Sequence, residues 1–92
     1  KLRLTKEAKR QIEEILQTRP SERGHFSAAF QQLRINPYPS NPNVPPGTIE
    51  RLRGSGDWRY KVSYRYRMRY LVQGDTVTVH KVMHRKDIYR YP

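Results

Sequence analysis

The sequence of 92 residues contains no cysteine, so it can form neither a disulfide framework nor a thiolate zinc site. Its three histidines and eight acidic residues show no metal-ligand spacing, and we therefore expect no metal and no cofactor. No apolar run approaches the roughly 18 residues of a membrane span, and no signal-peptide core is present. These absences predict a soluble, cytoplasmic single domain, residues 1–92, without a membrane partner.

Acidic residues are scarce, and their scarcity is uneven along the chain. Eight Asp and Glu stand against nineteen Lys and Arg, which gives a formal net charge of +11. Residues 51–90 carry eleven basic and three acidic residues, whereas residues 1–50 carry eight and five. A positive charge concentrated in one part of a small domain predicts a polyanionic partner, because it attracts phosphate and raises the association rate.

The N-terminal half has the hydrophobic spacing of one short strand and two helices. Alternating leucines predict a strand at residues 1–4. Thr5 is placed to cap a helix that runs to about Thr18, with an apolar stripe along one face. Ser21 is placed to cap a second helix over residues 22–33. The two stripes predict an antiparallel helical hairpin packed against a sheet.

The C-terminal half has the period of an antiparallel sheet. Five prolines between residues 37 and 47 predict an ordered, extended loop. Apolar and polar residues then alternate over 58–62, 65–72 and 76–83, and Gly74 opens a turn between the last two segments. The predicted fold class is α+β with the order β-α-α-β-β-β, in which three antiparallel strands follow the helices.

Five basic residues alternate along the first two of these strands. Side chains two apart in a strand point to the same face, so these cations are expected to share the face away from the helices. A charged face is often only a solubility feature and a protection of sheet edges. Five charges of one sign with few interspersed acids repel one another, however, and favour a site for a polyanion. The five cations are Arg59, Lys61, Arg65, Arg67 and Arg69.

A cluster of chemically capable side chains ends the chain. His84 and Arg85 close the last predicted strand, and Tyr89 follows four residues after Arg85. Taken singly, a histidine is more often structural and a terminal tyrosine more often packs. Beside a basic sheet face, they predict phosphate binding by arginine, proton transfer by histidine, and stacking on a base by tyrosine.

Four segments together resemble the RelE/ParE superfamily of toxin–antitoxin systems. The order helix, helix, Leu-Arg-Gly and three strands matches along essentially the whole chain, and the last segment is the most specific. The segments are Leu52-Arg53-Gly54, Trp58-Arg59-Tyr60-Lys61-Val62, Tyr66-Arg67-Met68-Arg69-Tyr70 and His84-Arg85-Lys86-Asp87-Ile88-Tyr89. The resemblance implies the RelE-like microbial RNase fold.

The resemblance also implies an activity and partners. Toxins of the RelE branch are mRNA interferases that inhibit translation by cutting messenger RNA in the ribosomal A site, next to 16S rRNA, without a metal. The 2′-hydroxyl of one nucleotide attacks the next phosphate and leaves a 2′,3′-cyclic phosphate and a 5′-hydroxyl. A cognate acidic antitoxin is the implied protein partner, with a toxin–antitoxin heterotetramer as one assembly. An acidic, partly disordered segment would be attracted to the net charge of +11 and cover the basic face.

The family motifs place functional roles on two sets of residues. The implied catalytic set is Lys61, Arg67, Arg85, Tyr89 and His84. Lys61 is the candidate base or charge stabiliser, and Arg67 and Arg85 are phosphate clamps, with Arg85 also assisting protonation of the leaving oxygen. Tyr89 would orient or stack on the substrate, and His84 is an alternative acid or base. The implied RNA-binding set is Arg53, Arg59, Arg65, Arg69 and Lys86.

Arg59 stands where relatives commonly carry a lysine, so only Lys61 can serve as a lysine base.

Two other interpretations stay open. A ParE-like toxin that poisons DNA gyrase without being an enzyme has the same fold, so fold alone does not choose. A basic RNA-binding module without catalysis would keep the charge but has no need of His84 and Tyr89 together. The clustered catalytic set favours the endoribonuclease.

Overall fold

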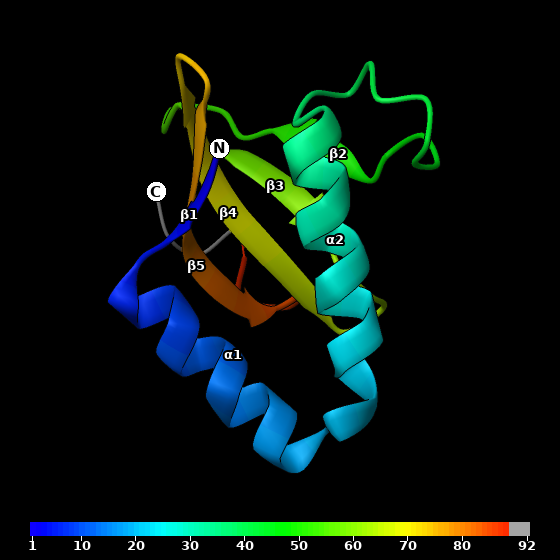
Figure 1. Cartoon of the computed structure of the whole chain (residues 1–92), viewed down its shortest axis with the longest axis vertical. Helices are drawn as coiled ribbons and strands as arrows, with labels where there is room; N and C mark the ends of the chain where they lie inside the picture. The colour runs from blue at the N-terminus through cyan, green and yellow to red at the C-terminus, as the bar shows by residue number, and fades with distance from the viewer. Residues whose placement is uncertain (89–92) are drawn as a thin grey trace.

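The computed structural model describes residues 1–88 and places two helices on one face of a five-stranded sheet (Figure 1). The elements follow the predicted order, with one short strand and one 3-10 turn in addition. They are β1 (Leu2–Leu4), α1 (Lys6–Thr18), η1 (Pro20–Glu22), α2 (Arg23–Ile35), β2 (Ile49–Arg51), β3 (Trp58–Lys61), β4 (Tyr66–Gln73) and β5 (Thr76–His84).

The sheet is mixed, whereas the sequence predicted antiparallel strands only. Its strand order is β1-β5-β4-β3-β2, and the last four strands of this order pair antiparallel. β1 pairs parallel with β5, in the register of Leu2 with Val77 and Leu4 with Val79. Parallel pairing needs a long crossover between the strands, which the two helices and the rest of the sheet supply. The α+β class is confirmed, and the sheet gains β1 and β2 at its edges.

The two predicted helices form, and their N-terminal ends differ in how they are capped. The Thr5 side chain accepts a hydrogen bond from the Ala8 backbone N–H at 3.1 Å, as predicted for a helix cap. The predicted cap at Ser21 is wrong, because Ser21 lies inside η1 and α2 begins without a side-chain cap. From η1 the helices diverge across the sheet (Figure 1). Neither helix is long and apolar enough to cross a membrane, within residues 1–88.

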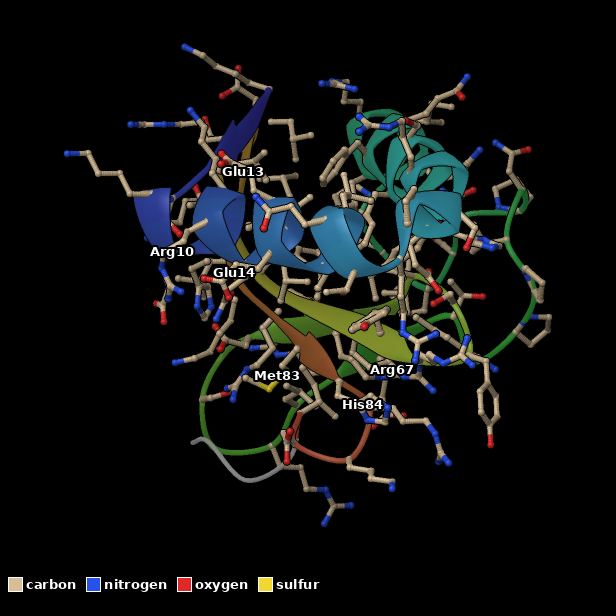
Figure 2. All side chains as sticks on the ribbon, turned by 90° about the horizontal axis from the view of Figure 1, so that it is seen from below. Arg10, Glu13, Glu14, Arg67, Met83 and His84 are labelled. Carbon is tan, nitrogen blue, oxygen red and sulfur yellow. The ribbon has the colours of Figure 1, made fainter. Side chains whose placement is uncertain are left out.

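The core lies between the helices and one face of the sheet. Alternation along β3, β4 and β5 sends the apolar residues of these strands toward the helices. The largest fully buried core side chains are Phe26, Leu33, Met68, Tyr70 and Val79. Leu52 and Ile88 are also buried but stand outside this core cluster. Figure 2 shows the segment after β5 on the side of the sheet opposite the helices, so part of the second face is covered too.

Candidate functional site

The basic residues of β3 and β4 form two rows on the sheet face away from the helices. In the β3–β4 ladder Arg59 lies opposite Arg69, and Lys61 lies opposite Arg67. The sequence predicted that all of these cations would face solvent together. That prediction is wrong for the first row, because Arg59 and Arg69 are only 5% and 1% exposed.

Arg69 belongs to a buried charge network that involves a carboxylate from the preceding loop. Its Nη2 lies 2.7 Å from Asp57 Oδ2, and Asp57 Oδ1 lies 3.1 Å from His80 Nε2. Asp57 is itself buried, so its charge requires these partners. The network ties the loop before β3 to β4 and β5. Arg69 therefore stabilises the fold through a buried ion pair, and its predicted RNA-binding role stays a prediction.

Arg59, which lies opposite Arg69 on β3, is also held by a carboxylate and a backbone carbonyl. Its Nη2 donates to the Gly47 carbonyl at 2.8 Å and lies 3.2 Å from Glu50 Oε2 on β2. Glu50 is the register partner of Arg59, so the short β2 delivers the carboxylate to the arginine. The Arg59 guanidinium thus anchors the loop that leads into β2, and its predicted RNA-binding role stays a prediction.

The second row lies beside the turn between β3 and β4 and remains more accessible. Lys61 is exposed, and Arg67 is partly buried. Nη1 of Arg67 donates to the carbonyls of Ser63 at 2.6 Å, Tyr66 at 3.1 Å and Tyr64 at 3.2 Å. These contacts orient the Arg67 guanidinium over the turn. The remaining basic residues of the predicted RNA-binding set, Arg53, Arg65 and Lys86, are exposed.

Arg85 joins this turn from the end of β5. Its backbone N–H donates to the Arg65 carbonyl at 2.7 Å. Its guanidinium lies 4.6 Å from the centre of the Tyr64 ring, and Nη2 donates to the Tyr64 hydroxyl at 3.1 Å. The Arg85 Nε is buried and has no hydrogen-bond partner among residues 1–88. A guanidinium that is fixed by stacking is suited to receive an anion.

His84 lies next to these arginines with its ring orientation fixed. Its Nδ1 accepts from the Lys86 backbone N–H at 3.2 Å, and its ring packs edge-on against Tyr66 with 6.0 Å between centroids. A nitrogen that accepts carries no proton, so neutral His84 carries its hydrogen on Nε2. His84 is thus a hydrogen-bond donor through Nε2, and proton transfer through Nδ1 requires release of the Lys86 amide. Figure 2 shows Arg67 and His84 at the same end of the sheet.

Tyr64 is the residue of this corner that the sequence interpretation missed. It is 69% exposed, its ring carries Arg85, and its carbonyl accepts from Arg67. The signal was present in the sequence, because an exposed aromatic residue between two basic strands is typical of a stacking surface for RNA. Tyr89, predicted to stack on the substrate, lies outside the described residues.

The structure therefore brings together most of the predicted catalytic set. We define the β3–β4 corner as Lys61, Tyr64, Arg67, His84 and Arg85. It offers three cations, an imidazole N–H and an exposed aromatic ring, which suits a phosphodiester of a single-stranded nucleic acid. No group of three or more potential metal ligands occurs among residues 1–88.

The sequence matches one protein-family model over residues 2–89, described as "ParE toxin of type II toxin-antitoxin system, parDE". A comparison with curated proteins finds no match.

Several solved structures with the same fold are described as toxins or toxin complexes. A YoeB/ParE toxin from Agrobacterium tumefaciens is 19% identical, with a TM-score of 0.73 and coverage of 91% of this chain and 96% of that one. YafQ from E. coli is 12% identical, with a TM-score of 0.72 and coverage of 97% of each chain. A YoeB–YefM complex from Staphylococcus aureus is 12% identical, with a TM-score of 0.68 and coverage of 90% of this chain and 93% of that one. At these identities the likeness establishes the fold.

Proposed function

The chain belongs to the ParE toxin family of type II toxin–antitoxin systems, and from this premise we propose that it is a metal-independent, ribosome-dependent endoribonuclease that cleaves messenger RNA. The observation that carries the proposal is the β3–β4 corner, where Arg67 and Arg85 are fixed by separate contacts to one turn. A surface that only attracts nucleic acid needs no such fixed pair. Two positioned guanidiniums beside an amine and an imidazole match the needs of phosphoryl transfer.

The proposed reaction is an attack of the substrate's own 2′-hydroxyl on the adjacent phosphorus. The oxygen–phosphorus bond to the 2′-oxygen forms while the bond to the 5′-oxygen of the next nucleotide breaks. Negative charge on the phosphoryl oxygens rises in the transition state, and Arg67 and Arg85 would stabilise it through charge-assisted hydrogen bonds. The products are a 2′,3′-cyclic phosphate and a 5′-hydroxyl.

The proton transfers are assigned to groups on either side of that phosphate. Lys61 is the candidate base or charge stabiliser for the 2′-hydroxyl, since its side chain is exposed to a substrate and lies opposite Arg67 in the ladder. The leaving 5′-oxygen would receive a proton with assistance from Arg85, whose guanidinium is held against Tyr64. His84 would donate through Nε2 to a phosphoryl oxygen, because Nδ1 already accepts from Lys86.

Inhibition of DNA gyrase is the second candidate function, and the description of the matching family model, parDE, is the observation that favours it. An inhibitor that works by binding a topoisomerase needs a complementary surface and has no use for proton transfer. The two functions therefore predict different responses to substitutions that preserve charge and fold.

An antitoxin is the proposed protein partner. The family name itself denotes a paired system, and the YoeB–YefM complex is a structural neighbour. An acidic segment would block activity by covering the cations of the β3–β4 corner. We expect titrated antitoxin to suppress activity in proportion to complex formation.

Primer extension on a defined messenger RNA, with and without programmed ribosomes, tests the nuclease proposal. The wild-type chain is expected to produce cuts in the A-site codon, and Lys61→Ala, Arg67→Ala and Arg85→Ala to lose them. Removal of one group that acts in the transition state typically lowers the rate about 100-fold or more. A matched control is Arg34→Ala, which removes one exposed cation from the end of α2.

The outcomes separate the two functions. Cuts that disappear in the three corner variants and persist in Arg34→Ala support the nuclease. Intact RNA under every condition, together with gyrase–DNA cleavage complexes trapped by the wild-type chain, would replace it with the gyrase function.

A further inference from the structure

A groove lies beside the β3–β4 corner and shares Lys61 and Tyr64 with it. It lies between α2 and the loop of residues 43–48 that leads into β2, and its volume is about 650 Å³. We call it the α2–loop groove. Its lining includes Ala28, Gln32, Asn43, Pro45, Pro46 and Tyr64.

The loop wall of this groove is fixed in place. Asn41 is 3% exposed, and its amide donates to the Gln32 side-chain oxygen at 3.2 Å and to the Asn36 carbonyl at 2.9 Å. Further along the loop, Arg59 donates to the Gly47 carbonyl at 2.8 Å. The groove is therefore held open between anchored walls, and a ligand would not have to order them.

The lining combines flat apolar walls with amide groups. Ala28 on α2 and Pro45 and Pro46 on the loop are small or rigid, which leaves room for a planar ring. The Gln32 side-chain oxygen already accepts from Asn41, so its amide N–H groups remain for a ligand, and the Asn43 side chain is exposed. A planar group with apolar faces and polar edges is the chemical description of a nucleobase.

Tyr64 connects this groove to the phosphate-binding corner. Its side chain lines the groove and also carries the Arg85 guanidinium at 4.6 Å from the ring centre. Lys61 lines the groove as well. When the phosphate of one nucleotide contacts Arg85, the base of the neighbouring nucleotide thus lies within reach of the groove. Tyr64 then lies between this phosphate and this base.

We propose that the α2–loop groove is a base-binding subsite for a nucleotide that flanks the phosphate held at the β3–β4 corner. The proposal rests on the proposed nuclease function and assigns it a place where base identity is read. The groove offers amide groups next to phosphate-binding cations, which suits a base of single-stranded RNA better than an aliphatic ligand. A protein segment from an antitoxin is the competing occupant, and the test separates the two.

The direct test is an amide NMR titration with a trinucleotide of 2′-O-methyl RNA, which binds but cannot be cleaved because the attacking hydroxyl is blocked. Resonances of Ala28 and Gly47 in the groove are expected to shift together with that of Arg85. Ala28→Leu narrows the groove at an exposed helix position and is expected to weaken binding about five- to a hundredfold, the range of one stacked base. The matched control is Ser27→Leu, which adds the same side chain at an exposed neighbour outside the groove lining.

A second substrate makes the assignment specific. The wild-type chain should bind a trinucleotide more weakly when the base that occupies the groove has been removed. For that ligand, Ala28→Leu should cause no further loss of affinity. Such non-additivity identifies the base and the groove as partners. Additive losses, or shifts confined to the β3–β4 corner, would overturn the subsite.

Two further outcomes are distinguishable. If Arg85→Ala abolishes cleavage while Ala28→Leu changes neither RNA binding nor base preference, the nuclease stands and the subsite is rejected. If Ala28→Leu weakens binding of the antitoxin alone, the groove is a protein-docking site and the subsite is likewise rejected. A wild-type chain that neither binds nor cleaves RNA rejects both proposals.

Discussion

At the scale of single residues, the largest difference between the sequence prediction and the structure is the burial of charged side chains. Arg59 and Arg69 alternate with apolar residues as surface cations would, and strand period alone gives the face on which they lie. It does not reveal whether another segment covers that face. The covering residues come from a loop and from the chain end, represented by Asp57 and by Ile88, which is fully buried. Both are distant in sequence from Arg69, so their position could not be inferred from local spacing.

Arg69→Met provides the test of the buried network. The substitution leaves Asp57 buried with only His80, and removing one partner of a buried ion pair typically costs about 3–5 kcal/mol. We expect the free energy of unfolding in urea to fall by about that amount. Arg65→Met serves as the control, because Arg65 is exposed and its loss should change stability by less than about 0.5 kcal/mol. Equal effects of the two substitutions would contradict the assigned role of Arg69.

The burial of Tyr70 predicts that the stability of the fold decreases in alkaline solution. Its side chain is fully buried, its hydroxyl donates to the Pro37 carbonyl at 2.7 Å, and burial raises the pKa of Tyr70 well above its ordinary value. Burial also raises the pKa of Tyr60. Above a pH of about 10 the unfolded chain loses tyrosine protons that the folded chain retains, so stability falls as pH rises.

The measurement is urea unfolding between roughly pH 8 and pH 11, a window that brackets tyrosine ionisation in the unfolded chain. Tyr70→Phe should be less stable than wild type at the lower pH, by about 1 kcal/mol for the lost hydrogen bond. This difference should shrink as pH rises, because the variant lacks the titrating group. A constant difference between Tyr70→Phe and wild type would reject the assignment.

At the scale of elements, periodicity predicted β1, the two helices and the three C-terminal strands, and missed β2 and the pairing of strands that are distant in sequence. The helices and the three C-terminal strands have enough residues to show a period of 3.6 or 2. β2 has three residues, which are too few to show a period. It forms because its residues pair with β3, where Glu50 lies opposite the buried Arg59. The parallel pairing of β1 with β5 joins chain segments more than seventy residues apart, which no local pattern reports.

The loop between α2 and β2 is predicted to depend on one side chain. Asn41→Ala removes the bonds to Gln32 and Asn36 and leaves their oxygens without this donor, at a cost of about 1–3 kcal/mol. Amide hydrogen exchange in residues 41–48 should then accelerate relative to the strands. Asn43→Ala is the control, because its side chain is exposed. Unchanged exchange in Asn41→Ala would show that the five prolines alone hold the loop.

At the scale of the whole molecule, a net charge of +11 gives attraction for any polyanion. Attraction of this kind is diffuse and loses strength with salt, so it does not distinguish an organised site from a basic surface. The structure distributes the charge unequally, since Arg59 and Arg69 are buried and form ion pairs with Glu50 and Asp57. The cations left for a nucleic acid are thus fewer than the composition suggests.

Salt dependence of RNA binding separates the site from the overall charge. Binding of single-stranded RNA weakens with salt in proportion to the phosphates neutralised, with a slope of about −0.7 per contact in a double logarithmic plot. If Lys61, Arg67 and Arg85 together neutralise three phosphates, the wild-type slope should be about −2 for a 2′-O-methyl tetranucleotide, which carries three phosphates, and each alanine variant should reduce it by about 0.7. Arg34→Ala removes the same charge far from the corner and should leave the slope unchanged. An equal reduction by Arg34→Ala and Arg85→Ala would show that diffuse charge, and not the β3–β4 corner, binds the RNA.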